Sequence, residues 1–310
     1  MKENNYVSIV LYYHNVDHSV IDNFANQLYE GLLVNFKNYE VIIANDSQDS
    51  EGLDLLIAAL NKFAEHNTIT VIDFPEYIGV ETAMMAGDDL TIGDYIYEFD
   101  NLNIEFDKKL LMETYRLTME GNDVVSVGPR EADTSFFSKI FYKIYNKSVS
   151  TKQKLHTEVF RILSRRAFNR AKAMAKVISY RKAIYAASGM KHCYLADESV
   201  RFLAGHDKNE EKMRWKLGFN SLMLFTNTVQ KFSVFISCFF LVIVVAITAY
   251  IVLVFALGKP VAGWTPIMMY LSICFFGIFS LFAIVLKYLS IILDMVYHKN
   301  TYIIESIRKV

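Results

Sequence analysis

Cysteine and histidine are too few and too scattered in this sequence to build a disulfide scaffold or a metal site. Among 310 residues there are three cysteines, and the seven histidines lack the spacing of metal ligands. Net charge is also almost absent, at −1, while 53% of the residues are apolar. This composition excludes a disordered chain, a collagen-like repeat and a disulfide-stabilised domain. The cysteines are therefore expected to be reduced thiols in a reducing compartment.

The near-zero net charge conceals two segments of opposite sign. Residues 1–133 contain 25 acidic and 7 basic residues, whereas residues 134–196 contain 14 basic residues and one acid, Glu158. A change of sign on this scale predicts a surface that faces an anion. Nucleic acid, phospholipid and a phosphorylated substrate all satisfy that description.

Two long uncharged runs favour a membrane. Residues 232–257 and 264–286 hold 26 and 23 residues without a charged side chain. At about 1.5 Å per residue each run can cross the ~30 Å hydrocarbon core of a bilayer as a helix. Lysine and arginine are more frequent in the segments that flank the two runs than in the connection 258–263 between them. The positive-inside rule therefore places the N-terminal domain and both termini in the cytoplasm. The sequence predicts a cell-membrane protein with two spans, and nucleic acid is disfavoured as its partner.

The segments beside these runs complete the expected domain organisation. Residues 1–206 are expected to form the catalytic domain, and residues 287–310 a cytosolic tail. Residues 207–231 mix cations with large apolar side chains, which suits an amphipathic helix in the headgroup layer. An ordinary helix packed on the domain is the alternative.

The first 130 residues alternate between strand and helix patterns. Strand-like runs cover 7–13, 39–44, 68–73, 94–99 and 123–128, and helix-like runs cover 19–34, 52–65, 79–90 and 108–120. This order predicts an α/β domain with a mainly parallel, Rossmann-like sheet covered on both faces. Ligands of such sheets bind beyond the carboxyl ends of the strands, where Asp46, Glu98 and Asp100 stand.

The spacing of Glu98 and Asp100 adds a chemical expectation. Residues i and i+2 of a strand face the same side, so both carboxylates can reach one site. Two oxygen ligands beside a diphosphate suit Mg²⁺ or Mn²⁺. A solvated strand end is the simpler alternative.

Five segments follow one another in a set order. They are an opening strand at 7–15, a polar turn at 45–50, a Gly-x-x-x-Ala helix at 79–94, an acid-x-Asp strand end at 95–103 and a Phe-Arg segment at 160–166. In this order, and with two apolar runs behind them, they resemble family 2 glycosyltransferases of the GT-A fold. The closer resemblance is to polyprenyl-phosphate glycosyltransferases of the dolichyl-phosphate mannose synthase-like group, which end in two membrane helices.

The resemblance implies a function and a set of roles. A single sugar would move, with inversion, from a nucleotide-sugar, UDP-linked by expectation, to a polyprenyl phosphate such as undecaprenyl phosphate, for cell-envelope glycan modification. A homo-oligomer is compatible with this architecture. The implied nucleotide-binding residues are Tyr12, Asn15, Asp46, Gly79 and Ala83; Glu98 and Asp100 would hold Mg²⁺ or Mn²⁺; the catalytic residues would be Asp100, Arg130 and Arg161; and Arg130, Lys139, Arg161 and Arg165 would bind the acceptor phosphate.

Two departures from the family pattern keep a second interpretation open. Glu98 replaces the first Asp of the metal motif, and Val159 stands where an Asp normally precedes Phe-Arg. The missing Asp is tolerable, because an acceptor phosphate with a second pKa near ~6 is already a nucleophile at neutral pH. The alternative to an enzyme is a catalytically degenerate membrane scaffold.

Overall fold

The computed structural model describes most of the chain and divides it into two units. Residues described are 2–14, 16–63, 69–130, 142–143, 145–147, 154–174, 180–203, 264–297 and 302–310, with scattered helical positions between 235 and 253. One unit comprises residues 1–218 together with 300–310, and the other comprises residues 219–299.

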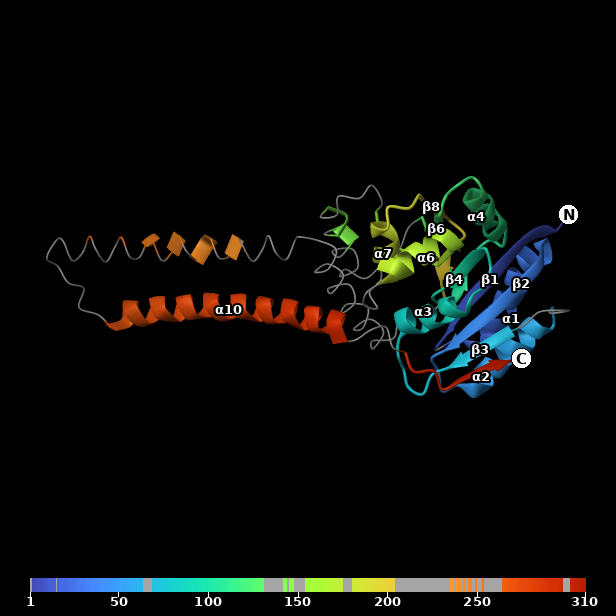
Figure 1. Ribbon diagram of the computed structural model, residues 1–310, viewed down its shortest axis with the longest axis horizontal. Coiled ribbons are helices and arrows are strands. Elements are labelled where there is room, and N and C mark those ends of the chain that lie inside the picture. Colours follow the sequence, from blue (N-terminus) through green and yellow to red (C-terminus); the bar gives the residue numbers. More distant parts are fainter. Residues whose placement is uncertain are drawn as a thin grey trace. The chain divides into compact units, whose positions relative to one another are not determined.

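The first unit is built on a mixed sheet (Figure 1). Over the described residues this sheet has eight strands in the order β10-β3-β2-β1-β4-β7-β6-β8. Neighbours from β3 to β4 pair in parallel, as do β6 and β8, whereas β7 and β10 run antiparallel to their neighbours. The strands are β1 Glu3–Tyr13, β2 Phe36–Asn45, β3 Ile69–Asp73, β4 Tyr95–Phe99, β6 Val124–Pro129, β7 Phe160–Ser164, β8 His192–Asp197 and β10 Ser306–Lys309, with β5 Ile104–Glu105 and β9 Arg201–Phe202 forming a separate pair. The expected α/β class with a mainly parallel sheet is confirmed.

Helices cover both faces of this sheet (Figure 1). The helices of this unit are α1 His18–Gly31, η1 Leu33–Asn35, α2 Ser50–Asn61, α3 Val80–Leu90, α4 Lys109–Met119, α6 Arg165–Met174 and α7 Arg181–Ala187. On one face, side chains of α1, α2 and α4 share a buried core with Tyr97 and Phe99 of β4. Glu98 lies between them in sequence and therefore faces the other side, where α3 packs on β1 and β2.

The close packing of α3 depends on one glycine. A Cβ atom at Gly87 would lie 2.6 Å from Cγ1 of Val10 on β1, which is too close for any side chain. Gly87 therefore lets the backbone of α3 approach the strands. This approach brings the acidic residues of α3 to the face that carries Glu98.

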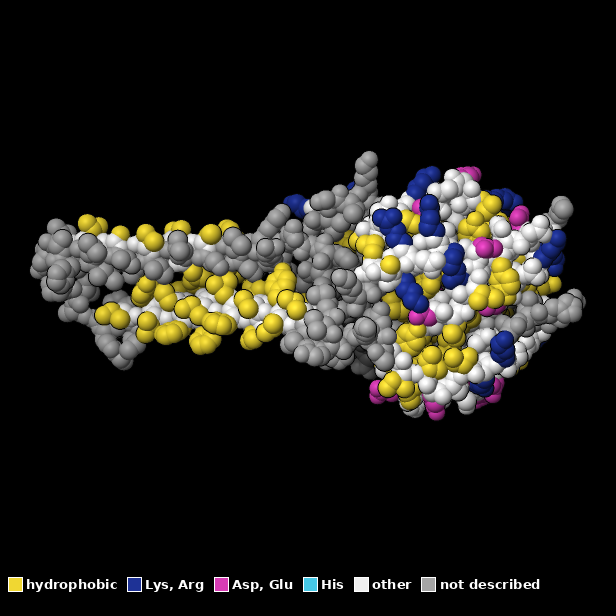
Figure 2. Space-filling view, in the orientation of Figure 1, with side chains coloured by type: hydrophobic (Ala, Val, Ile, Leu, Met, Phe, Trp, Pro, Cys, Tyr) yellow, Lys and Arg dark blue, Asp and Glu magenta, His cyan; other side chains and the backbone are white. Residues whose placement is uncertain are grey.

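The second unit contains the long helix α10, Trp264–Tyr297. Hydrophobic side chains lie along it, including the exposed Phe275, Phe276 and Phe279 (Figure 2). Within the part of the chain that the structure describes, no helix is long and apolar enough to cross a membrane. The expected segment 207–231 and most of 232–257 lie outside the described residues.

The segment expected as a tail, residues 287–310, contributes to two elements of the structure. α10 continues to Tyr297, beyond the expected end of the second apolar run. Residues 306–309 then form β10, which pairs antiparallel with β3 at the edge of the sheet. The end of the chain is thus part of the first unit, because β3 offers an open strand edge for pairing.

Candidate active site

Glu98 and Asp100 lie at the carboxyl end of β4, where they meet an arginine from the neighbouring strand. The antiparallel register of β4 and β7 places Arg161 directly opposite Glu98. Nε of Arg161 donates to Glu98 Oε2 at 2.5 Å, Nη2 to Asp100 Oδ2 at 2.6 Å and Nη1 to Glu158 Oε2 at 2.8 Å. Cross-strand partners project from the same face of a sheet, so strand register itself produces this contact.

A second arginine enters the same cluster from the first residue of α7. Nη1 of Arg181 donates to Glu98 Oε2 at 2.7 Å, and Nη2 donates to Asp100. Its Nε and its backbone N–H both donate to Oε2 of Glu81 on α3, at 3.0 and 2.9 Å. One turn further along α7, the hydroxyl of Tyr185 donates to Glu98 Oε1 at 2.6 Å. The two guanidinium groups and Glu98 are buried, whereas the side chain of Asp100 is 22% exposed.

The carboxyl groups of this cluster differ in their protonation. Burial raises the pKa of Asp88 well above its usual value, and the neighbouring Glu98 carboxylate adds to the effect. Asp88 is therefore the cluster member that holds a proton most readily. Burial also acts against ionisation of Glu98 and Asp100, but Arg161 and Arg181 outweigh it and lower the pKa of both. Glu98 and Asp100 are charged, and their charge is matched from within the protein.

The pair Glu98 and Asp100 does not fit a divalent cation as the sequence predicted. Oε1 of Glu98 accepts from Tyr185 and Oε2 accepts from both arginines, and the side chain is fully buried. Mg²⁺ and Mn²⁺ need several oxygen ligands open to one point. Among the residues that the structure describes, no group of three or more His, Cys, Asp or Glu side chains converges on such a point. Asp100 is the partly exposed member of the pair, whereas Glu98 is enclosed by its protein partners.

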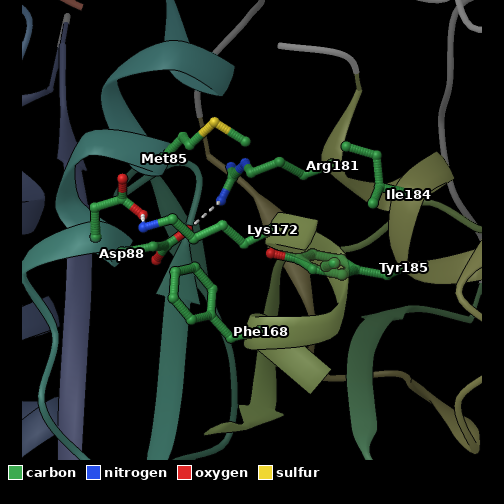
Figure 3. A pocket seen from close by; sticks show the side chains of 9 residues that line it. Met85, Asp88, Phe168, Lys172, Arg181, Ile184 and Tyr185 are labelled. Carbon is green, nitrogen blue, oxygen red and sulfur yellow. Dashed lines mark ion pairs between the residues drawn. The ribbon is translucent and has the colours of Figure 1, made fainter. Parts of the chain in front are cut away.

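A small hollow lies beside the cluster, between α3, α6 and α7 (Figure 3). Arg181 extends toward Asp88 there, with 3.6 Å between Nη1 and Oδ2, and Lys172 forms an ion pair with Asp89 at 2.6 Å. Its lining residues are Met85, Asp88, Asp89, Phe168, Ala171, Lys172, Arg181, Ile184 and Tyr185. The hollow is too small to accept a sugar nucleotide, and it belongs to the wall of the cluster.

Asp46, the predicted nucleoside ligand, fastens the loop before α3. Its carboxylate accepts hydrogen bonds from the backbone N–H groups of Ile78 at 2.9 Å and Gly79 at 2.7 Å, and from the Tyr12 hydroxyl at 2.9 Å. Gly79 has φ 83°, a left-handed conformation that glycine adopts most easily, and its carbonyl accepts from the N–H of Ala83. Burial raises the pKa of Asp46, although these hydrogen bonds oppose the shift. The structure thus brings together four of the predicted nucleotide-binding residues, around a buried carboxylate.

The other predicted phosphate ligands lie apart from this arrangement. Arg130, just after β6, is 65% exposed and pairs with Glu198. Arg165 follows β7 and donates to the carbonyl of Gly93, before the amino end of β4, so it lies at the opposite end of that strand from Asp100. The antiparallel direction of β7 thus carries Arg165 away from the cluster. Asn15 and Lys139 lie outside the described residues.

Sequence reasoning missed Arg181, Glu81 and Tyr185. Arg181 belongs to the basic segment 134–196, for which the sequence predicts a surface that faces an anion, and it is instead buried. The sequence did contain an indication of this burial. Ala183, Ile184 and Tyr185 follow the two cations at the start of α7, and such apolar residues predict a buried helix face. The single acid of the basic stretch, Glu158, is part of the same cluster.

Comparisons with known proteins agree with the fold. No family model matches the chain. It is 24% identical over 310 residues to "Uncharacterized glycosyltransferase sll0501" of Synechocystis, covering 97% of this chain and 95% of that protein. It is 23% identical over 289 residues to "Uncharacterized glycosyltransferase YkcC" of Bacillus subtilis, covering 87% and 84%. Among solved structures, glucosyl-3-phosphoglycerate synthase from Mycobacterium tuberculosis, with Mn²⁺, UDP and glucosyl-3-phosphoglycerate, superimposes with a TM-score of 0.52 at 12% identity, covering 72% of this chain and 80% of that one.

These findings give the fold and the kind of protein to which the chain is similar. The first unit has a fold of the GT-A type, and the similar proteins are named as glycosyltransferases. Together they support a transferase.

Proposed function

We propose that this protein is a membrane-bound glycosyltransferase that moves one sugar, with inversion, from a nucleotide-sugar to a polyprenyl phosphate. The observation that carries the proposal is the position of Asp100. It is the partly exposed member of an acidic pair at the carboxyl end of β4, the edge where sheets of this type bind ligands. The length of the match to named glycosyltransferases adds support.

The donor is assigned to the same edge of the sheet. Asp46 holds the loop at Ile78 and Gly79 in place, which shapes the wall beside β1. The rings of His14 and Tyr77 pack there with centroids 4.7 Å apart, and Tyr77 is exposed. An aromatic surface of this kind suits the flat face of a nucleobase. We therefore propose that the nucleoside lies against Tyr77 and the diphosphate toward Asp100, with a UDP-linked sugar as the expected donor.

The chemistry needs little from a general base. A phosphate monoester is mostly dianionic near neutral pH, because its second pKa is near ~6. One of its oxygens attacks the anomeric carbon, the bond from that carbon to the diphosphate breaks, and the nucleoside diphosphate leaves with the electron pair. A single displacement of this kind inverts the anomeric centre. Arg130, an exposed cation after β6, would bind the incoming phosphate by exchanging its pair with Glu198 for the phosphate oxygens.

The acceptor and the membrane location rest on the sequence. The two uncharged runs at 232–257 and 264–286 and the exposed phenylalanines of α10 suit a protein that meets a lipid substrate at the bilayer. We propose two spans with the first unit and both termini in the cytoplasm. The downstream role is modification of a cell-envelope glycan.

A lipid-product assay tests this proposal. The full chain in detergent is given undecaprenyl phosphate and a panel of UDP- and GDP-sugars, and extracted lipids are analysed by mass spectrometry. We expect a mass increase of one sugar with one donor, strongly reduced in Asp100→Ala and retained in Arg166→Met, whose side chain is 75% exposed. Sugar transfer to water or to another acceptor only would reject the polyprenyl phosphate.

One observation favours the alternative of a degenerate scaffold. Both carboxylate oxygens of Glu98 already accept hydrogen bonds from Tyr185, Arg161 and Arg181, which leaves neither of them open to a ligand. A scaffold predicts a folded, membrane-inserted chain that forms no product with any donor. The same assay distinguishes the two functions.

A further inference from the structure

The two buried arginines stand where a divalent cation would neutralise the acidic strand end. Arg161 donates to Glu98, Asp100 and Glu158, and Arg181 donates to Glu98, Asp100 and Glu81. A cation held between Glu98 and Asp100 would have to displace both guanidinium groups. We propose that Arg161 and Arg181 take the place of the metal in this chain, so that it binds its sugar-nucleotide donor without a divalent cation at Glu98 and Asp100.

Backbone geometry, and not only side-chain placement, supports the replacement of a metal ion by the two arginines. Arg161 is directly opposite Glu98 in the β4–β7 register, so its side chain is on the same face of the sheet for any rotamer. The backbone N–H of Arg181 is itself bonded to Oε2 of Glu81 at 2.9 Å, which fixes the start of α7 against α3. Two separate elements therefore deliver a guanidinium group to one pair of carboxylates.

Burial makes the ion pairs between the two arginines and the carboxylates difficult to break. Both guanidinium groups and Glu98 are buried. Removing an arginine from such a cluster leaves charged carboxylates without a partner in a region of low dielectric, which is strongly unfavourable. A metal ion would have to offset that loss in addition to its own dehydration.

Arginine also suits the proposed substrate. Nη2 of Arg161 and Nη2 of Arg181 both point to Asp100, the partly exposed residue of the cluster. A guanidinium group carries five N–H donors in a plane and matches the oxygens of phosphate groups. Both Nη2 groups already donate to Asp100, so a leaving diphosphate would share these donors with Asp100. This last step rests on the proposed function, whereas the exclusion of the metal does not.

Manganese binding can be measured directly on the full chain in detergent. The signal of free Mn²⁺ in electron paramagnetic resonance falls when the ion is bound. We expect the wild-type chain to leave this signal unchanged. Arg181→Met should bind Mn²⁺ at least about tenfold more tightly, because it exposes Glu98, Asp100 and Glu81 to the ion. Arg166→Met removes an exposed arginine from its pair with the buried Asp123 and is the matched control, for which we expect no gain.

Stoichiometric binding of Mn²⁺ by the wild-type chain, lost in Asp100→Asn, would overturn the inference. The wild-type titration decides this point even if Arg181→Met fails to fold. Calorimetric titration of UDP- and GDP-sugars in the presence of EDTA then separates the two proposals. Binding that needs Mn²⁺ would reject the inference alone, whereas a folded chain that binds no donor with or without Mn²⁺ would reject the proposed function.

Discussion

At the scale of single residues, Arg161 joins three carboxylates of the site. It makes three ion pairs, with Glu98, Asp100 and Glu158, from a buried position. We predict that Arg161→Met lowers the free energy of unfolding by about 3–5 kcal/mol, because it leaves buried carboxylates unpaired. Lys62→Met, at an exposed ion pair with Asp22, should cost less than about 1 kcal/mol. Thermal and denaturant unfolding of the two variants in detergent checks this difference, and equal losses would contradict it.

Asp88 gives a pH-dependent prediction at the same scale. Burial, followed by the charge of Glu98, raises the pKa of Asp88 well above its usual value. The folded state therefore holds this proton more tightly than the unfolded chain, so stability is lost as pH rises from the unfolded pKa near ~3.9 toward the folded one. Asp88→Asn removes this titration. We expect its unfolding temperature, relative to wild type, to increase between mildly acidic and mildly alkaline pH, and parallel curves for the two proteins would refute the assignment.

How far single residues could be predicted depends on how local their contacts are. The i, i+2 spacing correctly places Glu98 and Asp100 together, since strand alternation is a local property. Arg161 was assigned to the same site but to a bound phosphate, whereas it pairs with the acids themselves. That pairing depends on the register between β4 and β7, which are 60 residues apart in sequence and whose pairing no local pattern encodes.

At the scale of elements, β10 is the feature that local patterns failed to predict. The sequence predicts a separate tail after the apolar run that precedes β10. In the structure, Ser306 and Arg308 of β10 instead contact Asp73 on β3. Their side chains donate to Oδ2 of Asp73 at 2.7 and 3.1 Å, while Asn45 on β2 donates to Oδ1 at 2.7 Å. The parallel strands β1 to β4 were predictable, because each contains a mainly apolar run and helix patterns alternate with these runs along the chain.

The role of β10 can be tested by removing its two side-chain contacts. We predict that the double variant Ser306→Ala, Arg308→Ala loses about 1–2 kcal/mol, because Asp73 loses two hydrogen bonds. Amides of β3 should also exchange with deuterium faster, since the strand becomes a frayed edge. Lys309→Ala, an exposed position of the same strand, is the control. Unchanged exchange in β3 would show that β10 does not stabilise the sheet edge.

At the scale of the whole molecule, the proposed function requires an anchored chain. Phe276 of α10 is exposed and lies in the middle of the uncharged run 264–286. We predict that the chain stays with the membrane fraction after alkaline carbonate extraction, and that Phe276→Arg lowers the inserted fraction, since a central arginine costs about 2.5–3.5 kcal/mol on insertion. Lys287→Arg keeps the charge at the end of the run and should have no effect. Release of the wild-type chain by carbonate would contradict the membrane assignment.

We propose above all that this chain breaks the bond between a sugar and a nucleoside diphosphate and transfers the sugar to a polyprenyl phosphate. The most direct measurement is the release of UDP or GDP from a panel of sugar nucleotides by the full chain, with and without undecaprenyl phosphate. We predict release from one donor that rises sharply when the lipid is present and is lost in Asp100→Ala, while Arg166→Met behaves as wild type. No release from any donor by a folded chain, with the lipid present and with Mn²⁺ or EDTA, would contradict the account and favour a scaffold.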